Sequence, residues 1–100
     1  MSDSQKRTKI GQAKHDKKVL QRLNLYKEKH FSVKADLPGR AKPPKIGGRI
    51  PDIIAKKGKK LIIVEEIETP STKTTDKIQH DKLREGTKKL GGKFKVIIAK

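Results

Sequence analysis

The sequence predicts a small α/β domain in which two helices flank a mixed β-sheet, with the elements in the order α-β-β-β-α-β. Two apolar blocks, Leu61–Val64 and Val96–Ala99, have the length and composition of buried strands. Two other segments carry apolar residues at helical spacing, and the stretches between elements are rich in Gly and Pro. At 100 residues the chain fits a single domain. We expect a flexible basic N-terminus over residues 1–12 and one folded domain over residues 13–100.

The first half of the domain should contain a helix, a strand and a long loop. Residues 31–36 alternate in polarity and predict a strand. Residues 37–50 contain three prolines and three glycines and predict a loop. The helix is expected over residues 13–30, with one face made of residues three or four positions apart: Ala13, Asp16, Leu20, Leu23, Tyr26 and His30.

The second half should contain a hairpin, a helix and a last strand. Residues 50–55 and 61–69 predict strands joined by a turn over residues 56–60, in which Gly58 supplies a positive φ. Pro70 ends the third strand, and Ser71 or Thr72 can cap the helix that follows. That helix is expected over residues 73–90, with Gln79, Leu83, Gly86 and Leu90 on one face. Gly91 and Gly92 should end it before a strand over residues 94–99.

The composition excludes several classes of protein and points to an anionic partner. The chain has no cysteine, which excludes disulfide frameworks, thiolate metal sites and cysteine nucleophiles. Its longest apolar run is four residues, so we expect no membrane span. Residues 1–12 lack the apolar segment of a secretory signal, and we expect a cytoplasmic protein. A net charge of +16 then favours nucleic acid as the partner.

The basic residues are densest between Gly39 and Lys60, where Asp52 is the one acid. This stretch is predicted to contact the phosphate backbone, although a flexible connection is the alternative for its first part. The predicted nucleic-acid-binding residues are Arg40, Lys42, Lys45, Arg49, Lys56, Lys57, Lys59 and Lys60.

Carboxylates follow directly after this basic stretch. Glu66 and Glu68 continue the face of the third strand that carries Ile62 and Val64. Hairpin pairing brings the start of the second strand opposite the end of the third, which places Asp52 near both glutamates. Such an all-oxygen cluster suits Mg²⁺ or Mn²⁺, whereas a solvated strand end is the alternative interpretation.

The run from Pro51-Asp52 to Glu66-Ile67-Glu68 resembles the signature of the PD-(D/E)XK nuclease superfamily. The element order matches the superfamily's restriction-endonuclease-like core, and the chain looks most like the archaeal Holliday-junction resolvases. The resemblance implies an Mg²⁺-dependent DNA endonuclease acting on duplex or branched DNA, working as a homodimer without a small-molecule cofactor. Asp52, Glu66 and the Ile67 carbonyl would hold the metal.

The sequence departs from that family at one catalytic position, because Glu68 stands where the family has a lysine. Lys73 and Lys77 are candidates to supply the missing positive charge. Asp16 is the candidate for the glutamate that the family often carries on its first helix, although compensation of the helix dipole also explains it. Gln79 resembles a polar residue that relatives turn toward the site, although it also suits a surface position.

A second class of function remains open. The three histidines, His15, His30 and His80, show no metal-ligand spacing and are interpreted as ordinary surface or core residues. Since Glu68 replaces the lysine, a non-catalytic basic nucleic-acid-binding protein on a decayed nuclease fold is the alternative to a nuclease.

Overall fold

The computed structural model describes residues 9–69 and 77–99 and confirms the predicted α-β-β-β-α-β order. No helix in these two ranges has the length and apolar character needed to cross a membrane. The elements are α1 Lys9–Glu28, β1 Ser32–Ala35, β2 Ile53–Lys57, β3 Leu61–Glu68, α2 Lys77–Lys89 and β4 Lys93–Ile98.

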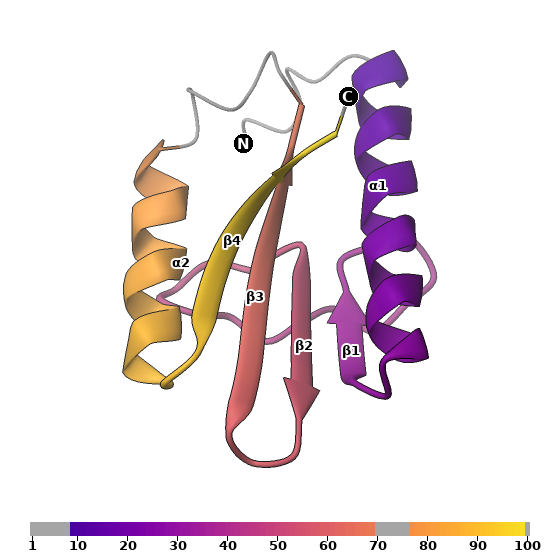
Figure 1. The fold of residues 1–100 in the computed structure, drawn as a ribbon. Coiled ribbons are helices and arrows are strands. Elements are labelled where there is room, and N and C mark those ends of the chain that lie inside the picture. The colour runs from indigo at the N-terminus through magenta and orange to yellow at the C-terminus, as the bar shows by residue number, and fades with distance from the viewer. Residues whose placement is uncertain (1–8, 70–76, 100) are drawn as a thin grey trace.

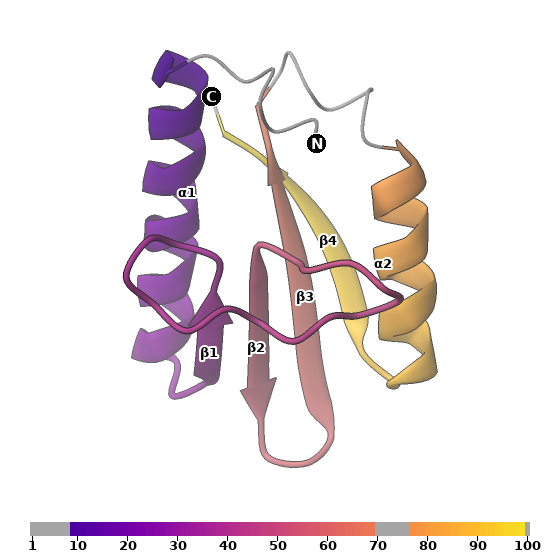
Figure 2. The same cartoon turned by 180° about the vertical axis from the view of Figure 1, so that it is seen from behind.

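The four strands form one mixed sheet in the order β1-β2-β3-β4. The first two pairs of neighbours are antiparallel, and β3 and β4 are parallel, with α2 between them in the chain as a crossover helix. The helices stand on either side of the strands (Figure 1). The loop between β1 and β2 crosses β2 and β3 on its way to α2 and back (Figure 2).

Each face of the sheet has its own apolar cluster, because successive strand residues point to opposite faces. On one face, α1 packs against odd-numbered residues of β2 and β3, such as Ile53 and Ile63. On the other face, Leu83 of α2 and Ile46 of the long loop pack against Ile54 and Val64. The loop is therefore part of the second core layer.

Helix α1 begins at Lys9, before the predicted boundary at residue 13, because polar residues such as Gln12 extend the helix without adding to its apolar pattern. Residues 9–12 therefore belong to the helix and not to the flexible terminus expected there. The helix ends at Glu28, before the predicted boundary. His30 adopts a left-handed conformation with φ of 66°, and the Phe31 amide donates to the Tyr26 carbonyl at 3.0 Å. This backbone arrangement terminates the helix.

The predicted buried face of α1 was partly wrong. Leu20 is 40% exposed, whereas Val19 is fully buried. His30 and Ala13 are also exposed, and His15 is buried instead. The face that meets the sheet follows the spacing of His15, Val19, Leu23 and Tyr26. Leu23 and Tyr26 lie on both the predicted and the observed face, so the helix is rotated by less than one residue from the predicted orientation.

The β2–β3 hairpin has the register that the sequence analysis required. Gly58 lies in its turn with φ of 64°. Strand β2 begins at Ile53, which is opposite Glu65, so Asp52 lies just before the strand rather than within it. The last residues of β3, from Glu66 onward, pair with β4 alone. One backbone edge of β3 is therefore open beside Asp52.

Helix α2 is described from Lys77 onward, so the predicted cap at Ser71 or Thr72 and the candidate Lys73 lie outside the described residues. The helix ends as predicted: Gly91 has φ of 76°, and the Gly92 amide donates to the Thr87 carbonyl at 2.9 Å. Leu90, which was predicted on the inner face, is 52% exposed because the chain has already left the helix there.

Candidate functional site

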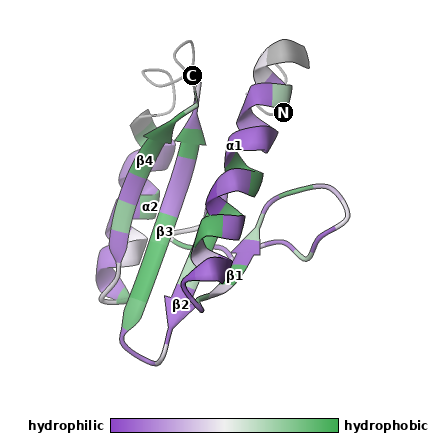
Figure 3. Cartoon of the chain, turned by 45° about the vertical axis from the view of Figure 1, so that its right-hand side comes forward, coloured by the Kyte–Doolittle hydropathy of each residue, from purple (hydrophilic) through white to green (hydrophobic). Residues whose placement is uncertain are grey.

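The three glutamates of β3 are buried, which overturns their interpretation as a solvated strand end. Glu65 is 0% exposed, and Glu66 and Glu68 are each 2% exposed. The strand passes from an apolar half to a polar half along its length (Figure 3). A buried carboxylate is costly unless it has a partner, so the partners of each one reveal what it does.

Glu65 points toward α1 and forms a closed ion pair. Arg22 donates to it through two nitrogens, with Nε 2.8 Å from Oε1 and Nη2 2.6 Å from Oε2. The Tyr26 hydroxyl donates to the same carboxylate. The hydrogen bond with Glu65 raises the pKa of Arg22, and burial, followed by Glu65, raises the pKa of Tyr26 to about 12. This triad fastens β3 to α1 and leaves no group for other chemistry.

Glu66 points to the opposite face, toward α2, and its partner there is a neutral amide. Gln79 Nε2 lies 3.3 Å from Oε2 and 3.5 Å from Oε1. Burial raises the pKa of Glu66 to about 10, with the nearby Asp52 carboxylate as the next cause and the Gln79 amide opposing it. The described residues therefore place two carboxylates together without a guanidinium or ammonium group between them.

Asp52 is held at the open edge of β3. Its Oδ2 accepts a hydrogen bond from the Ile67 amide at 2.7 Å. This amide has no partner in β2, because β2 starts at Ile53, opposite Glu65. The same oxygen lies 3.1 Å from Nε2 of His15, on α1. Asp52 thus joins the α1 side of the sheet to the α2 side. The amide of Ile67 is the group that meets Asp52, while the resemblance assigned a role to its carbonyl.

Glu68 shares the face of Glu66 and meets the other polar side chain of α2. His80 Nε2 lies 3.0 Å from its Oε2. The position at which the superfamily resembled by the sequence has a lysine is thus occupied by a buried carboxylate that contacts an imidazole. Gln79 and His80 are neighbours in α2, and together they contact both carboxylates on this face.

Asp16 reaches the site indirectly. Its Oδ1 accepts Gln12 Nε2 at 2.8 Å and lies 3.0 Å from Nδ1 of His15. Because the other ring nitrogen of His15 contacts Asp52, a continuous chain runs from Asp16 through His15 to Asp52. Asp16 is therefore positioned to orient the imidazole, and its described contacts are not with Glu66 or Glu68.

The predicted phosphate-binding residues are all exposed and fall into two groups. The members on the β1–β2 loop are Arg40, Lys42, Lys45 and Arg49, and those at the hairpin are Lys56 and Lys57 at the end of β2 and Lys59 and Lys60 in the turn. The turn predicted over residues 56–60 thus begins only after Lys57. The turn lies at the far end of β2 from Asp52, roughly 20 Å away at the rise of a strand. Lys57 also donates to the Lys29 carbonyl at 3.0 Å. The loop is thus the group closer to the carboxylates.

Sequence reasoning missed His15 and His80, which were interpreted as ordinary histidines. His15 lies four residues before Val19 and eight before Leu23, so helical spacing already placed it on the buried face. His80 precedes the buried Leu83 by three residues and follows Gln79 directly. Their spacing along the helices was the available signal, and a search for metal-ligand spacing did not detect it.

Within residues 9–69 and 77–99, no three side chains of Asp, Glu, His or Cys are grouped as a ready metal site. No protein-family model matches the chain, and neither a curated protein nor a solved structure matches it. The function is therefore argued from the arrangement of its own side chains.

Proposed function

We propose that this chain is a metal-dependent DNA endonuclease that hydrolyses phosphodiester bonds. One observation carries the proposal: Asp52 and Glu66 lie together, and buried Glu66 has a neutral amide as its described side-chain partner. Such an arrangement is unfavourable for the protein alone unless a proton or a cation neutralises it. In a chain of net charge +16, two neighbouring carboxylates that contact no lysine or arginine among the described residues suit a site for a cation.

The residues present fit Mg²⁺ or Mn²⁺, which prefer carboxylate and carbonyl oxygens. Asp52 and Glu66 would hold the ion, with the Ile67 carbonyl as the third group that the family resemblance implies. When bound, a divalent ion supplies Lewis-acid polarisation of a phosphate and a water of lowered pKa. Gln79 would orient the Glu66 carboxylate, and His15 would orient Asp52 from the opposite side.

The basic loop would position the DNA beside these carboxylates. Arg40, Lys42, Lys45 and Arg49 are exposed on it, and phosphate contacts from such residues fix the register of a duplex without reading its sequence. The family resemblance suggests branched DNA, such as a four-way junction, as the substrate. It also suggests a homodimer, in which two copies of the site address two strands.

The test is incubation with labelled four-way junction, duplex and single-stranded DNA, each with and without Mg²⁺ or Mn²⁺. We expect cleavage of at least one form that requires the metal. Asp52→Asn and Glu66→Gln should abolish cutting while they retain DNA binding, since each removes a negative charge near the phosphate. Asp81→Asn is the matched control, because Asp81 is an exposed carboxylate on α2 that pairs with Arg84.

A non-catalytic nucleic-acid-binding protein is the second candidate, and a specific observation favours it. Asp52 and Glu68 each contact a histidine already, so two of the three carboxylates have partners within the fold. Both candidates predict DNA affinity that falls with salt, with a log–log slope of about −0.9 per phosphate contacted. Melting in Mg²⁺ separates them, because an ion that binds only the folded protein raises its stability. Absence of both a melting shift and cleavage would leave the binding protein as the function.

A further inference from the structure

The β1–β2 loop contains a tight turn that is docked rigidly against α2. Ile46 and Arg49 exchange two backbone hydrogen bonds of 2.7 and 3.1 Å, and the intervening Gly47 and Gly48 have φ of 61° and 84°. These dihedrals match the two-glycine turn that closes a tight hairpin. The Ile46 side chain is buried in the core layer beneath α2. The turn is therefore fixed in place by its own backbone and by the core.

Two glycines let the backbone of this turn touch the backbone of the helix. A Cβ atom on Gly47 would lie 2.3 Å from the Lys82 carbonyl oxygen. A Cβ atom on Gly86 would lie 2.7 Å from the Gly47 nitrogen and from a methyl group of Ile46. Neither position has space for a side chain, so the approach requires glycine on both surfaces. The relative position of loop and helix is thus set by close contact.

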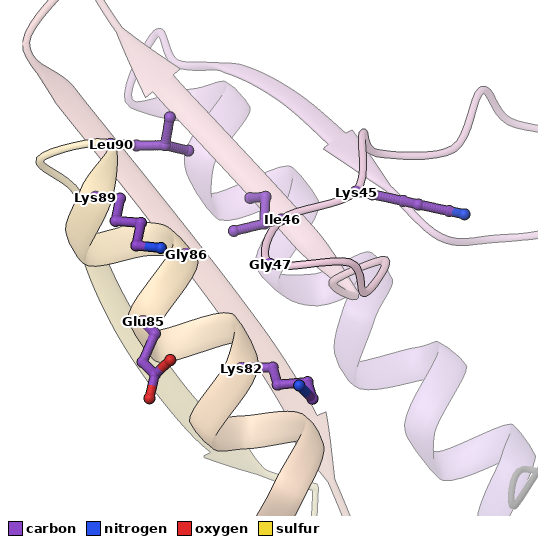
Figure 4. A pocket seen from close by; sticks show the side chains of 8 residues that line it. All are labelled: Lys45, Ile46, Gly47, Lys82, Glu85, Gly86, Lys89 and Leu90. Atoms are coloured by element: carbon purple, nitrogen blue, oxygen red, sulfur yellow. The ribbon is translucent and has the colours of Figure 1, made fainter.

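A cavity of about 330 Å³ lies along this junction. Figure 4 shows Lys82, Glu85 and Lys89 along α2 and Lys45 on the loop across from them. Three lysines and one glutamate give the lining an excess of positive charge, and all four side chains are exposed. The Lys45 side chain extends away from α2 in Figure 4 and would turn to reach a ligand in the cavity. Ile46, Gly47, Gly86 and Leu90 complete the lining. Flexible ammonium groups around a cavity with excess positive charge suit phosphate oxygens.

The cavity is aligned with the carboxylate site along α2. Gln79, which contacts Glu66, and Gly86, at the cavity, are seven residues apart and so share one face of the helix. At 1.5 Å per residue they are separated by roughly 10 Å. Because a DNA strand winds around its axis as it rises, successive phosphates are farther apart than the roughly 3.4 Å rise, and this distance corresponds to between one and two nucleotides.

We propose that the cavity between the loop turn and α2 binds a phosphodiester group of the DNA backbone one or two nucleotides from the phosphate held at the carboxylates. The position relative to the cut rests on the proposed endonuclease function, whereas the phosphate contact itself does not. Lys82 and Lys89 are new members of the DNA-binding surface, and Lys45 joins them from the loop. Free nucleotides and inorganic phosphate share this chemistry and are the other sources of a phosphate ligand.

The test uses charge reversal on the full-length protein in EDTA, so that binding is measured without cleavage. Lys82→Glu with Lys89→Glu should weaken duplex affinity by at least about tenfold and reduce the salt slope by about 0.9, the value for one lost phosphate contact. The matched control is Lys17→Glu with Lys27→Glu, two exposed lysines of α1 that change the net charge equally. An equal loss in both double variants would show a general charge effect and overturn the proposal.

Two further arms separate the ligand sources and the two proposals. One arm follows the Gly47 and Gly86 amide resonances in the presence of inorganic phosphate, a mononucleotide or duplex DNA. If a small ligand perturbs these resonances and duplex DNA does not, the cavity binds a small ligand and the contact with the DNA backbone is overturned. Neutral methylphosphonate linkages, placed one at a time, should reduce affinity at one position, and that sensitivity should vanish in the Lys82/Lys89 double variant. If the Lys82/Lys89 double variant loses DNA affinity but the wild-type protein cleaves no DNA in Mg²⁺, the phosphate contact stands and the endonuclease proposal fails.

Discussion

Glu65 and Glu66 are neighbours in β3 with the same burial, yet their surroundings differ completely. Glu65 faces α1 and receives two hydrogen bonds from the Arg22 guanidinium and one from Tyr26. Glu66 faces α2, where Gln79 offers a neutral amide at longer distance. The alternation of a strand sends the two carboxylates into different layers of the same molecule.

Glu65 therefore stabilises the fold through its counter-charge, whereas the charged form of Glu66 destabilises it. A buried charge that serves the fold has its counter-charge inside the fold, and Arg22 provides it for Glu65. Burial and the adjacent Asp52 instead raise the pKa of Glu66 to about 10, so the metal-free fold holds it in an unfavourable environment for its charge. Strained electrostatics of this kind are characteristic of ligand sites, and the following variants test the contrast.

The largest expected effect is loss of the counter-charge of Glu65. Arg22→Met retains the aliphatic part of the side chain and leaves Glu65 buried without its cation, which should reduce the free energy of unfolding by about 3–5 kcal/mol. Urea denaturation followed by circular dichroism measures this. The control Arg84→Met removes an exposed ion pair with Asp81 and should cost no more than about 1 kcal/mol.

The Arg22→Met variant can also fail to fold, since small domains have only about 5–15 kcal/mol of stability. The double variant Arg22→Met with Glu65→Leu then decides, because replacing both members of a buried pair by apolar residues restores much of the stability. If the double variant is no more stable than Arg22→Met, the Arg22–Glu65 pair does not have the structural role assigned to it.

An effect of opposite sign, which grows with pH, is expected at Glu66. Its pKa is raised from 4.5 to about 10, so the unfolded chain releases this proton at lower pH than the folded protein does. The wild-type fold in EDTA should therefore lose stability as pH rises through that window, and Glu66→Gln should remove the loss. We expect the variant to have a higher melting temperature than wild type, by about 4–8 °C for each kcal/mol of unfolding free energy regained. The difference in melting temperature should widen between about pH 5 and pH 9.

The matched control for this prediction is Glu65→Gln, which should destabilise the protein because Arg22 loses its partner. Added Mg²⁺ should raise the melting temperature of wild type and leave that of Glu66→Gln unchanged. A Glu66→Gln variant that is less stable than wild type across the whole pH range would remove the distinction between the two glutamates.

The sequence was sufficient to predict the backbone frame of the site. Strand alternation and a short hairpin placed Asp52 beside Glu66, and the observed register of Ile53 opposite Glu65 bears this out. Such inferences succeed because the two-residue period of a strand and the length of a turn leave few alternative registers. They depend on local geometry alone.

The partners of the carboxylates could not be predicted in the same way. Leu20 and Val19 both fit a helical apolar face that includes Leu23 and Tyr26, and the choice between them rotates α1 by a fraction of the roughly 100° between successive residues. That rotation decides whether His15 and Arg22 reach the sheet. The identity of each partner thus depends on how a helix docks, which local periodicity does not determine.

The smallest expected effect concerns Gln79, the residue that orients Glu66. Gln79→Ala should leave the stability of the metal-free protein nearly unchanged, because its contacts with Glu66 are 3.3 Å or longer. It should weaken Mg²⁺ binding by about tenfold, the lower range for loss of a group that orients a metal ligand. The measurement is the Mg²⁺ concentration that gives half of the full melting shift.

The neighbouring residue Ile78 provides the control, because it is 69% exposed. Ile78→Ala shortens one side chain of α2 and leaves Glu66 and Gln79 unchanged. The Gln79 amide opposes the rise in the Glu66 pKa by hydrogen bonding to the ionised carboxylate, so it favours the form of Glu66 that binds a cation. Its removal should therefore raise the required Mg²⁺ concentration more at lower pH, where protons compete with the ion. Identical Mg²⁺ midpoints for Gln79→Ala and Ile78→Ala at every pH would mean that Gln79 only covers Glu66, and the contrast between the two glutamates would then rest on Asp52 alone.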